Sequence, residues 1–309
     1  MSEFSHLTVL LRESIEALAI RPDGVYVDAT AGGGGHSFAI ASALTTGRLI
    51  AIDQDEAAIA AAGERLAPFA DRVQIVKSNF SRLSDILDEC GVDKIDGFLA
   101  DLGTSAPQLL ERGGSYRNDA PLDMRMDQSA AKTAYDVVNT YSEEELKRIL
   151  FTYGEERYSA KIAARIVRER AVAPIETTGE LVELIKNAIP AAAREGGHHP
   201  AKRSFQAIRI EVNGELDVIE PTIKAAVSRM NKGGRLAIIS FHSLEDRIVK
   251  QTFADLSSGC TCPKDLPVCV CGKKPLIKPI NKKPILPGEA ELEANPRSRS
   301  AKLRVAEKL

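Results

Sequence analysis

The sequence predicts an α/β protein: a Rossmann-like parallel sheet with helices on both faces and an all-helical domain inserted between strands four and five. Three observations lead to this prediction. Short apolar segments alternate with helical ones up to about residue 101, which is typical of a parallel sheet. From about residue 109 to 210 helical patterns dominate. Strand and helix then alternate again. We expect residues 1–108 and 213–309 to form a discontinuous core and 109–212 to form the inserted domain.

The first strand is predicted over residues 25–28 and leads into a loop with four consecutive glycines, Gly32 to Gly35. Glycine adopts positive φ without steric penalty and lets the backbone approach a ligand closely. The second strand, 49–53, ends in Asp53, where an acid can accept hydrogen bonds from ribose hydroxyls. We therefore expect a site for a nucleoside cofactor here. A purely structural glycine turn is the other interpretation.

NAD and S-adenosylmethionine are the two candidate cofactors. A dinucleotide site has the pattern G-x-G-x-x-G and holds a pyrophosphate at a helix N-terminus. In this chain Phe38 stands in the place of the third glycine. Asp28 lies just before the loop, and its carboxylate would repel a pyrophosphate but suits the positive ammonium and sulfonium of S-adenosylmethionine. The sequence therefore favours S-adenosylmethionine.

The other elements follow in order from their periodicity. In the core, helices are predicted at 59–66, 83–90, 216–230 and 244–256, strands at 73–77, 95–101, 235–240 and 300–306, and a turn at 231–234. In the insertion, one helix starts after Ser142 with a capping box to Glu145, and others span 159–170 and 178–188. The segment before the last strand is rich in Pro, Gly and Lys, which indicates an irregular surface loop.

Composition limits the class of protein. The 309 residues are 44% hydrophobic and 27% charged, as in an ordinary globular protein. No stretch approaches the roughly 18 apolar residues of a membrane span, and no signal peptide is visible, so we expect a cytoplasmic protein with no membrane contact. Residues 259–309 carry a net charge of +6 and the rest −8. A basic tail suggests contact with phosphates, although a solvated tail has the same charge.

Four of the five cysteines lie together, as Cys260, Cys262, Cys269 and Cys271. Four thiolates can hold zinc, but C-x-C pairs are less usual for zinc than C-x-x-C. The alternative is free thiols in a loop, and we assign no metal. Cys90 is most simply a small buried apolar residue.

Candidate site residues follow the carboxyl ends of the strands, where open parallel sheets bind ligands. Phe80 follows the third strand, where its ring can stack on adenine or pack in the core. The segment from Asp101 to Gln108 follows the fourth strand and leads into the insertion, so it is the expected active-site loop. His242 and Ser243 follow the fifth strand and could line the pocket of the acceptor.

These residues belong to a wider pattern, and the chain resembles the bacterial small-subunit ribosomal RNA (cytosine-N4)-methyltransferases, the RsmH/MraW family. The resemblance spans nearly the whole chain. Its motifs include HLTVLL at 6–11, the loop at 28–37, DLG at 101–103, PLDMRMD at 121–127, YGEER at 153–157, HPA at 199–201, FQAIR at 205–209, SFHSLEDR at 240–247 and NPRSRS at 295–300. The set is specific in this order, although no single motif would be.

The resemblance implies an enzyme that methylates N4 of a cytidine near the decoding centre of 16S ribosomal RNA, with S-adenosylmethionine as donor. It places the cofactor contacts on Gly34, Gly35, His36, Asp53, Phe80, Asp101 and Gln108. One departure is visible. The family loop usually has two serines where this chain has Ser105 and Ala106, so we assign no catalytic role to that position.

Asp101 is the candidate catalytic residue, because a carboxylate there could accept a hydrogen bond from the target amine and later its proton. It could instead only bind the cofactor. Candidate RNA contacts are Arg157, Lys161, Arg165 and Arg168, which share one helical face. Residues 109–213 hold 16 basic and 16 acidic residues, so a merely solvated face is the alternative.

The expected partner is 16S ribosomal RNA, within the small ribosomal subunit, and no obligate protein partner is inferred. Two other functions remain. One is a non-catalytic ribosome-assembly factor, which would have no need of a cofactor loop. The other is an NAD-linked oxidoreductase, which Phe38 and Asp28 disfavour.

Overall fold

The computed structural model describes residues 8–105, 108, 111–191, 199–259, 262, 268 and 271–309. The chain divides into a core unit, Met1–Gly103 with Leu216–Leu309, and a helical unit, Thr104–Glu215. The domain boundaries expected from the sequence lie within a few residues of these. In the helical unit, Arg209 binds Glu215 in bidentate fashion, at 2.9 Å for each contact, and donates to Thr104 Oγ1 at 3.4 Å. These bonds fasten both ends of the helical unit to one helix.

The core unit contains a seven-stranded sheet in the order β3-β2-β1-β4-β5-β7-β6. The strands are β1 Val25–Asp28, β2 Arg48–Asp53, β3 Val73–Lys77, β4 Ile95–Asp101, β5 Met230–Ser240, β6 Ile277–Pro279 and β7 Lys302–Lys308. Strands β1 to β5 are parallel, and β7 runs antiparallel to β5 and β6. The order reverses direction beside β1, so the ends of β1 and β4 form the switch point at which such sheets bind ligands.

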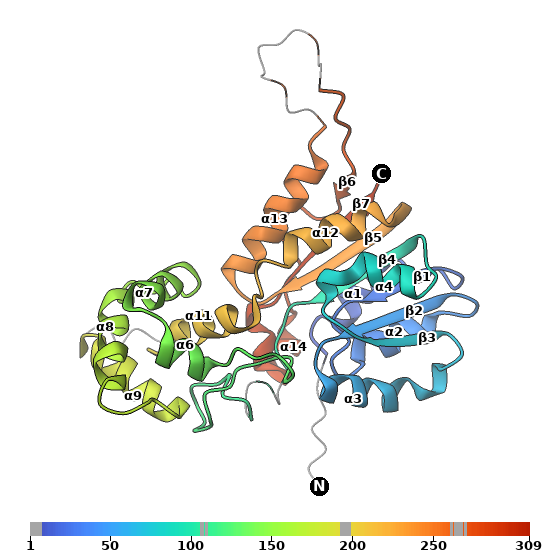
Figure 1. Ribbon diagram of the computed structural model, residues 1–309. Coiled ribbons are helices and arrows are strands. Elements are labelled where there is room, and N and C mark those ends of the chain that lie inside the picture. The colour runs from blue at the N-terminus through green and yellow to red at the C-terminus, as the bar shows by residue number, and fades with distance from the viewer. Residues whose placement is uncertain are drawn as a thin grey trace. The chain divides into compact units, whose positions relative to one another are not determined.

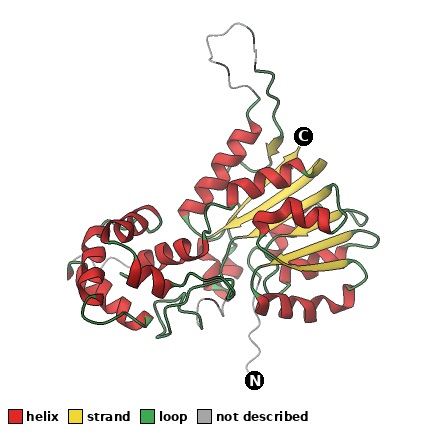
Figure 2. Cartoon of the chain, viewed as in Figure 1, coloured by secondary structure: helices red, strands yellow, loops and turns green. Residues whose placement is uncertain are grey.

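Helices cover both faces of the sheet (Figures 1 and 2). One face packs on α1 Leu11–Leu18, α2 Gly35–Ala43 and α3 Glu56–Leu66. The other packs on α4 Leu83–Glu89, α12 Ile219–Ser228 and α13 Ser243–Ser257. Successive strand residues alternate between the two cores: Ile50 and Ile52 lie in one, Leu49 and Ala51 in the other. Strands buried on both faces read as the continuous apolar runs seen in the sequence.

Short elements complete the core unit. They are η1 Ala67–Phe69, η2 Phe80–Arg82, α14 Glu289–Ala294 and η3 Pro296–Ser300. Among the described residues, no helix is both long and apolar enough to cross a membrane.

The helical unit has its own apolar core. Its described α-helices are α6 Ala134–Thr140, α7 Glu143–Thr152, α8 Ser159–Arg170, α9 Thr178–Ala188 and α11 Lys202–Asn213. The capping box expected at the start of α7 is present, with Ser142 and Glu145 each bonded to the other's backbone N–H. The described residues 111–133 of this unit form turns and bends without a helix, and an isolated antiparallel bridge joins Pro121 to Thr177.

The fold class is confirmed, and three local predictions were incomplete. Strand β5 begins at Met230, so the expected turn at 231–234 lies within it, as a bulge opposite Asp96 of β4. Asn231 donates to the Asp96 carboxylate at 2.9 Å, which holds the bulge in place. Helices α1, α6, α11 and α14 were not predicted individually, and β6 lies in the segment expected to be irregular.

Candidate functional site

The loop after β1 is held by backbone bonds to both neighbouring strands. Ala29 donates to the carbonyl of Leu99 in β4, and Ala31 to that of Ile52 in β2, each at 2.8 Å. Gly34 donates to Ala31 at 2.8 Å and closes the turn into α2. The loop is therefore a fixed part of the sheet edge.

The glycines of this loop differ in what requires a residue without a side chain. Gly34 caps α2 with φ of +76°, a conformation that other residues rarely adopt. A Cβ on Gly35 would lie 1.8 Å from the hydroxyl of Thr8. Gly33 has ordinary φ and no atom within 4 Å of where its Cβ would be. The loop thus has open space on which a ligand can rest against backbone, which fits a nucleoside cofactor.

Asp28 acts on the loop itself. Its side chain is fully buried and accepts hydrogen bonds from Ser37 Oγ at 2.6 Å and from the backbone of Thr30 at 3.2 Å. Burial raises the pKa of Asp28 to about 6, against the opposing effect of these bonds. From the sequence, Asp28 was expected to act on the charge of the ligand, and that expectation stays a prediction. Its contacts show that Asp28 ties the end of β1 to the start of α2.

Asp53, at the end of β2, is half-buried and also holds the loop. Its Oδ2 accepts the N–H of Gly32 at 2.8 Å, and its Oδ1 accepts that of Asp55 at 2.9 Å. Burial raises the pKa of Asp53 above its usual value. Each carboxylate oxygen has a second lone pair, so this side chain can hold the loop and still accept bonds from a ribose.

The end of β3 is linked to that of β2. Ser78 donates its backbone N–H to the backbone carbonyl of Asp53 at 2.9 Å, and Asn79 donates its side-chain amide to Gln54 Oε1 at 2.8 Å. Phe80 follows, half-buried against the core beneath α4 and α12. Its ring is therefore packed on one side and partly accessible, which is compatible with both roles considered for it.

Asp101 ends β4 beside the glycine loop. Its N–H donates to Thr30 Oγ1 at 2.7 Å, and its Oδ1 accepts the N–H of Gly103 at 3.0 Å. Burial, together with the smaller effects of the negative charges of Asp28 and Glu245, raises the pKa of Asp101 to about 7. Near neutral pH this carboxyl group is thus divided between protonated and ionised forms, as suits a group that exchanges protons.

His242 and Glu245 form a capping box that was not predicted from the sequence. Glu245 is buried and accepts the N–H of Phe241 at 2.7 Å and that of His242 at 3.2 Å. Nε2 of His242 lies 3.0 Å from the Glu245 carboxylate, and Nδ1 faces the Glu245 N–H at 3.5 Å. The imidazole is turned onto its own helix, so it is occupied in capping α13. The H-x-x-E spacing after a strand could have revealed this.

The structure therefore brings together Gly34, Gly35, His36, Asp53, Phe80 and Asp101 at one edge of the core unit. His36 lies buried in the first turn of α2. Gln108 belongs to the helical unit, where its side chain accepts the N–H of Ser105 at 3.0 Å. Ala106, the departure in the active-site loop, lies outside the described residues.

The expected RNA-binding stripe follows α8. Lys161 and Arg168 are exposed, Arg165 is half-buried, and Arg157 lies before the helix with its guanidinium 5.4 Å from the ring of Tyr158. Arg165 and Arg168 both pair with Glu169, at 2.9 and 3.0 Å. That shared carboxylate reduces the positive charge at the C-terminal end of the stripe.

Two further features lie elsewhere. Cys260 and Cys269 of the cysteine cluster are outside the described residues, so the zinc hypothesis stays untested.

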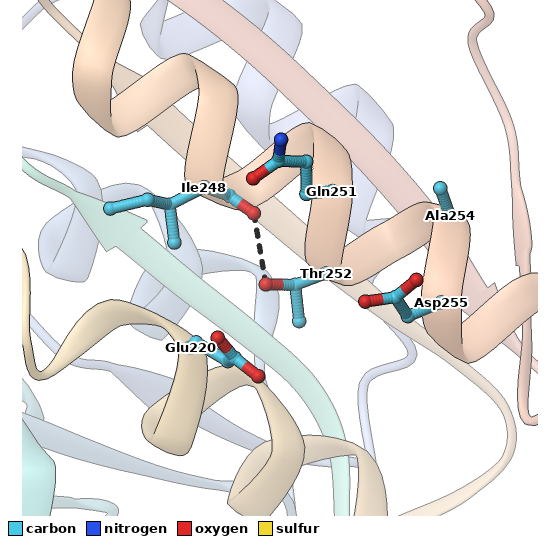
Figure 3. A pocket seen from close by; sticks show the side chains of 6 residues that line it. All are labelled: Glu220, Ile248, Gln251, Thr252, Ala254 and Asp255. Carbon is cyan, nitrogen blue, oxygen red and sulfur yellow. Dashed lines mark hydrogen bonds between the residues drawn. The ribbon is translucent and has the colours of Figure 1, made fainter.

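A surface pocket between α12 and α13 is lined by Glu220, Ile248, Gln251, Thr252, Ala254 and Asp255 (Figure 3). Its charged residues are both acidic, and the Thr252 hydroxyl donates to Ile248 O at 2.9 Å. None of the strand-end residues lines it.

A parallel sheet with this switch point, a glycine loop after β1 and an acid after β2 defines a Rossmann-like nucleoside-cofactor enzyme. The chain belongs to the MraW methylase family, whose family model matches residues 3–309. Three relatives named ribosomal RNA small subunit methyltransferase H are each 59% identical to it. That of Brevibacillus brevis covers 99% of this chain and 98% of its own length, and those of Paenibacillus sp. and Clostridioides difficile cover 99% and 100%.

Family membership confirms the predicted resemblance. It also confirms the prediction of a methyl-transferring enzyme and the choice of S-adenosylmethionine over NAD. The individual contact residues stay predictions.

Proposed function

We propose that this enzyme transfers the methyl group of S-adenosylmethionine to the exocyclic N4 of a cytidine in 16S ribosomal RNA, near the decoding centre. The full-length similarity to relatives named as small-subunit ribosomal RNA methyltransferases carries the proposal. The grouping of strand-end side chains around the glycine loop supports it. We propose cofactor contacts at Gly34, Gly35, His36, Asp53, Phe80, Asp101 and Gln108.

Asp101 is the proposed catalytic residue. The exocyclic amine of cytosine is a poor nucleophile because its lone pair is delocalised into the ring. An ionised Asp101 can accept a hydrogen bond from one N–H, turn the lone pair toward the methyl carbon and take the proton when the new C–N bond forms. S-adenosylmethionine supplies the electrophilic methyl group, whose bond to sulfur breaks as the C–N bond forms. Holding the reactants in line accounts for much of the expected acceleration.

The helical unit is the proposed RNA clamp. A stacked base cannot reach a donor held at a sheet edge, so the cytidine must be turned out of its stack. Arg157 and Lys161 are the proposed phosphate contacts, with weaker contributions from Arg165 and Arg168 because both pair with Glu169. We propose the small ribosomal subunit as the substrate, with no obligate protein partner, and a cytoplasmic location.

The test uses methyl-labelled S-adenosylmethionine with naked 16S RNA or small ribosomal subunits, followed by digestion to nucleosides. We expect label in N4-methylcytidine. Asp101→Asn is assayed at saturating cofactor, because Asp101 is also a proposed cofactor contact. It should lose at least about 100-fold in turnover, the range of general-base contributions. Asp71→Asn, at an exposed position, is the matched control. Label in another nucleoside would contradict the proposed acceptor, and full turnover by Asp101→Asn would contradict the proposed base.

A further inference from the structure

The C-terminal part of the core unit carries a strongly basic segment. Residues 271–286 contain five lysines, Lys273, Lys274, Lys278, Lys282 and Lys283, and no acidic residue. All five side chains are exposed, and none forms an ion pair with an acidic residue of the described chain. We call residues 273–283 the lysine edge.

The backbone of the lysine edge is anchored to the sheet. Ile280 donates to Val305 O at 2.9 Å, and Ile285 and Leu303 exchange two bonds of 2.9 Å. The Asn281 side chain accepts the N–H of Val305 at 2.8 Å and donates to Lys283 O at 2.7 Å. Lys278, Lys282 and Lys283 therefore project from a fixed strand and its continuation, so little backbone order would be lost when they bind a partner.

Exposed apolar side chains accompany the lysines. Leu276 is 44% exposed, Ile280 46% and Leu286 59%. A surface that combines unpaired cations with exposed apolar groups suits a partner that carries both negative charge and less polar parts. RNA offers both, in its phosphates and its sugars.

Protection of a sheet edge is the competing explanation, because lysine and proline on edge strands discourage pairing between sheets. The opposite edge of the same sheet offers a comparison. The eleven residues 70–80 around β3 hold two cations, and both pair with acids: Arg72 with Asp71 at 3.2 Å and Lys77 with Glu56 at 3.1 Å. Edge protection alone thus does not account for five unpaired lysines around a three-residue strand.

We propose that the lysine edge binds the phosphate backbone of ribosomal RNA outside the catalytic site. This inference rests on the proposed function, since it names a second contact with the same substrate. Such a contact is independent of sequence and would raise affinity for the folded RNA without touching the target base.

The test compares two triple variants of the full chain. One is Lys278→Gln with Lys282→Gln and Lys283→Gln. The matched control, Lys224→Gln with Lys232→Gln and Lys250→Gln, removes the same charge from exposed positions elsewhere in the core unit. Binding to naked 16S RNA is measured as a function of salt. We expect the lysine-edge variant to bind at least about tenfold more weakly at 0.1 M salt. Its salt slope should fall by about 2, because each phosphate contact contributes 0.7–0.9 to that slope. The control should match the parent.

Three outcomes overturn the inference. The two variants could bind RNA equally well, or the lysine-edge variant could change only its self-association in sedimentation, which would indicate edge protection. It could also lose affinity for S-adenosylmethionine, which would indicate a disturbed core. Methylation of RNA by the parent protein is scored separately. If the parent protein methylates RNA and the lysine-edge variant binds RNA as well as the parent does, the proposed function is retained and only the second RNA contact is rejected.

Discussion

Ser37 donates a hydrogen bond of 2.6 Å to Asp28, and both side chains are fully buried. The bond links the last residue of β1 to the first turn of α2 and spans the glycine loop between them. A buried carboxylate needs such partners, because burial without them favours its neutral form. Asp28 still has a pKa of about 6, so at neutral pH the loop depends on a charge that its surroundings only partly stabilise.

Ser37→Ala should destabilise the protein by about 2 kcal/mol at pH 8, the range for hydrogen bonds to charged groups. The loss should be smaller at pH 5, where Asp28 is largely protonated and needs its donor less. Free energies of unfolding from urea titrations at both pH values measure this. Ser42→Ala is the matched control in the same helix, since the Ser42 hydroxyl is exposed and bonds only to Phe38 O. A pH-independent loss would contradict the assigned role of the charge.

Gly34→Ala should destabilise the protein by about 1–2 kcal/mol, because alanine would have to adopt a left-handed conformation. Gly33→Ala is the control within the same loop, since its φ is ordinary and the space around it is open. Its thermal midpoint should match that of the parent, although a methyl group there can hinder the cofactor. Equal midpoints for both variants would show that the loop relaxes freely at Gly34.

The sheet could be predicted because its signals are local. Residues 73–77 and 95–101 were predicted with the bounds of β3 and β4. The half-buried edge strand β3 alternates in polarity, and the buried strand β4 is mostly apolar between turn residues. Strand β6 could not be predicted in this way. Its three residues, Ile277–Pro279, lie between lysines and prolines and are ordered by pairing with β7, which is distant in sequence. Non-local pairing of this kind leaves no periodic pattern.

The candidate site likewise has a part that could be predicted from the sequence and a part that could not. Strand ends locate Asp53 and Asp101 at once, because the edge that holds ligands follows from the topology. What these carboxylates bond to depends on side chains that carry no motif. Thr30 holds the N–H of Asp101, and Glu245 adds a negative charge near it from a helix more than a hundred residues later. Neither relationship could be predicted from spacing.

Asp53→Asn should weaken binding of S-adenosylmethionine by about 10- to 100-fold, equivalent to losing one charge-assisted hydrogen bond with a ribose hydroxyl. The asparagine can still accept one backbone N–H, so the fold should survive. Titration calorimetry measures the affinity, and thermal unfolding without cofactor checks the fold. Asp55→Asn is the neighbouring comparison, because Asp55 caps α3 through Ala57 N at 3.1 Å. Unchanged affinity in Asp53→Asn would remove this residue from the cofactor site.

The pH dependence of methyl transfer should show a loss of rate at acid pH, the acid limb, that reflects protonation of Asp101. Its pKa is raised to about 7, so the group is neutral and unable to accept the amine hydrogen bond below that pH. We expect kcat/KM at constant cofactor to rise with pH through about 7 and then level off. The same raised pKa favours folding below about pH 4, and this contribution is lost as pH rises through 7. Asp101→Asn should therefore gain stability relative to the parent, by at least about 1 kcal/mol, between pH 4 and pH 8.

Glu245→Gln separates the electrostatic part of this behaviour from the packing around Asp101. Glutamine has the shape of glutamate and can still accept the N–H of Phe241, but it lacks the charge that raises the pKa of Asp101. The acid limb should therefore move to lower pH, while the maximal rate stays within a few-fold of the parent. Lys302→Gln is the control. Lys302 pairs with Asp246, the residue that follows Glu245 in α13, and its loss should leave the acid limb at the same pH. An unmoved limb in a folded Glu245→Gln protein would show that burial and the charge of Asp28 set the pKa of Asp101 without Glu245.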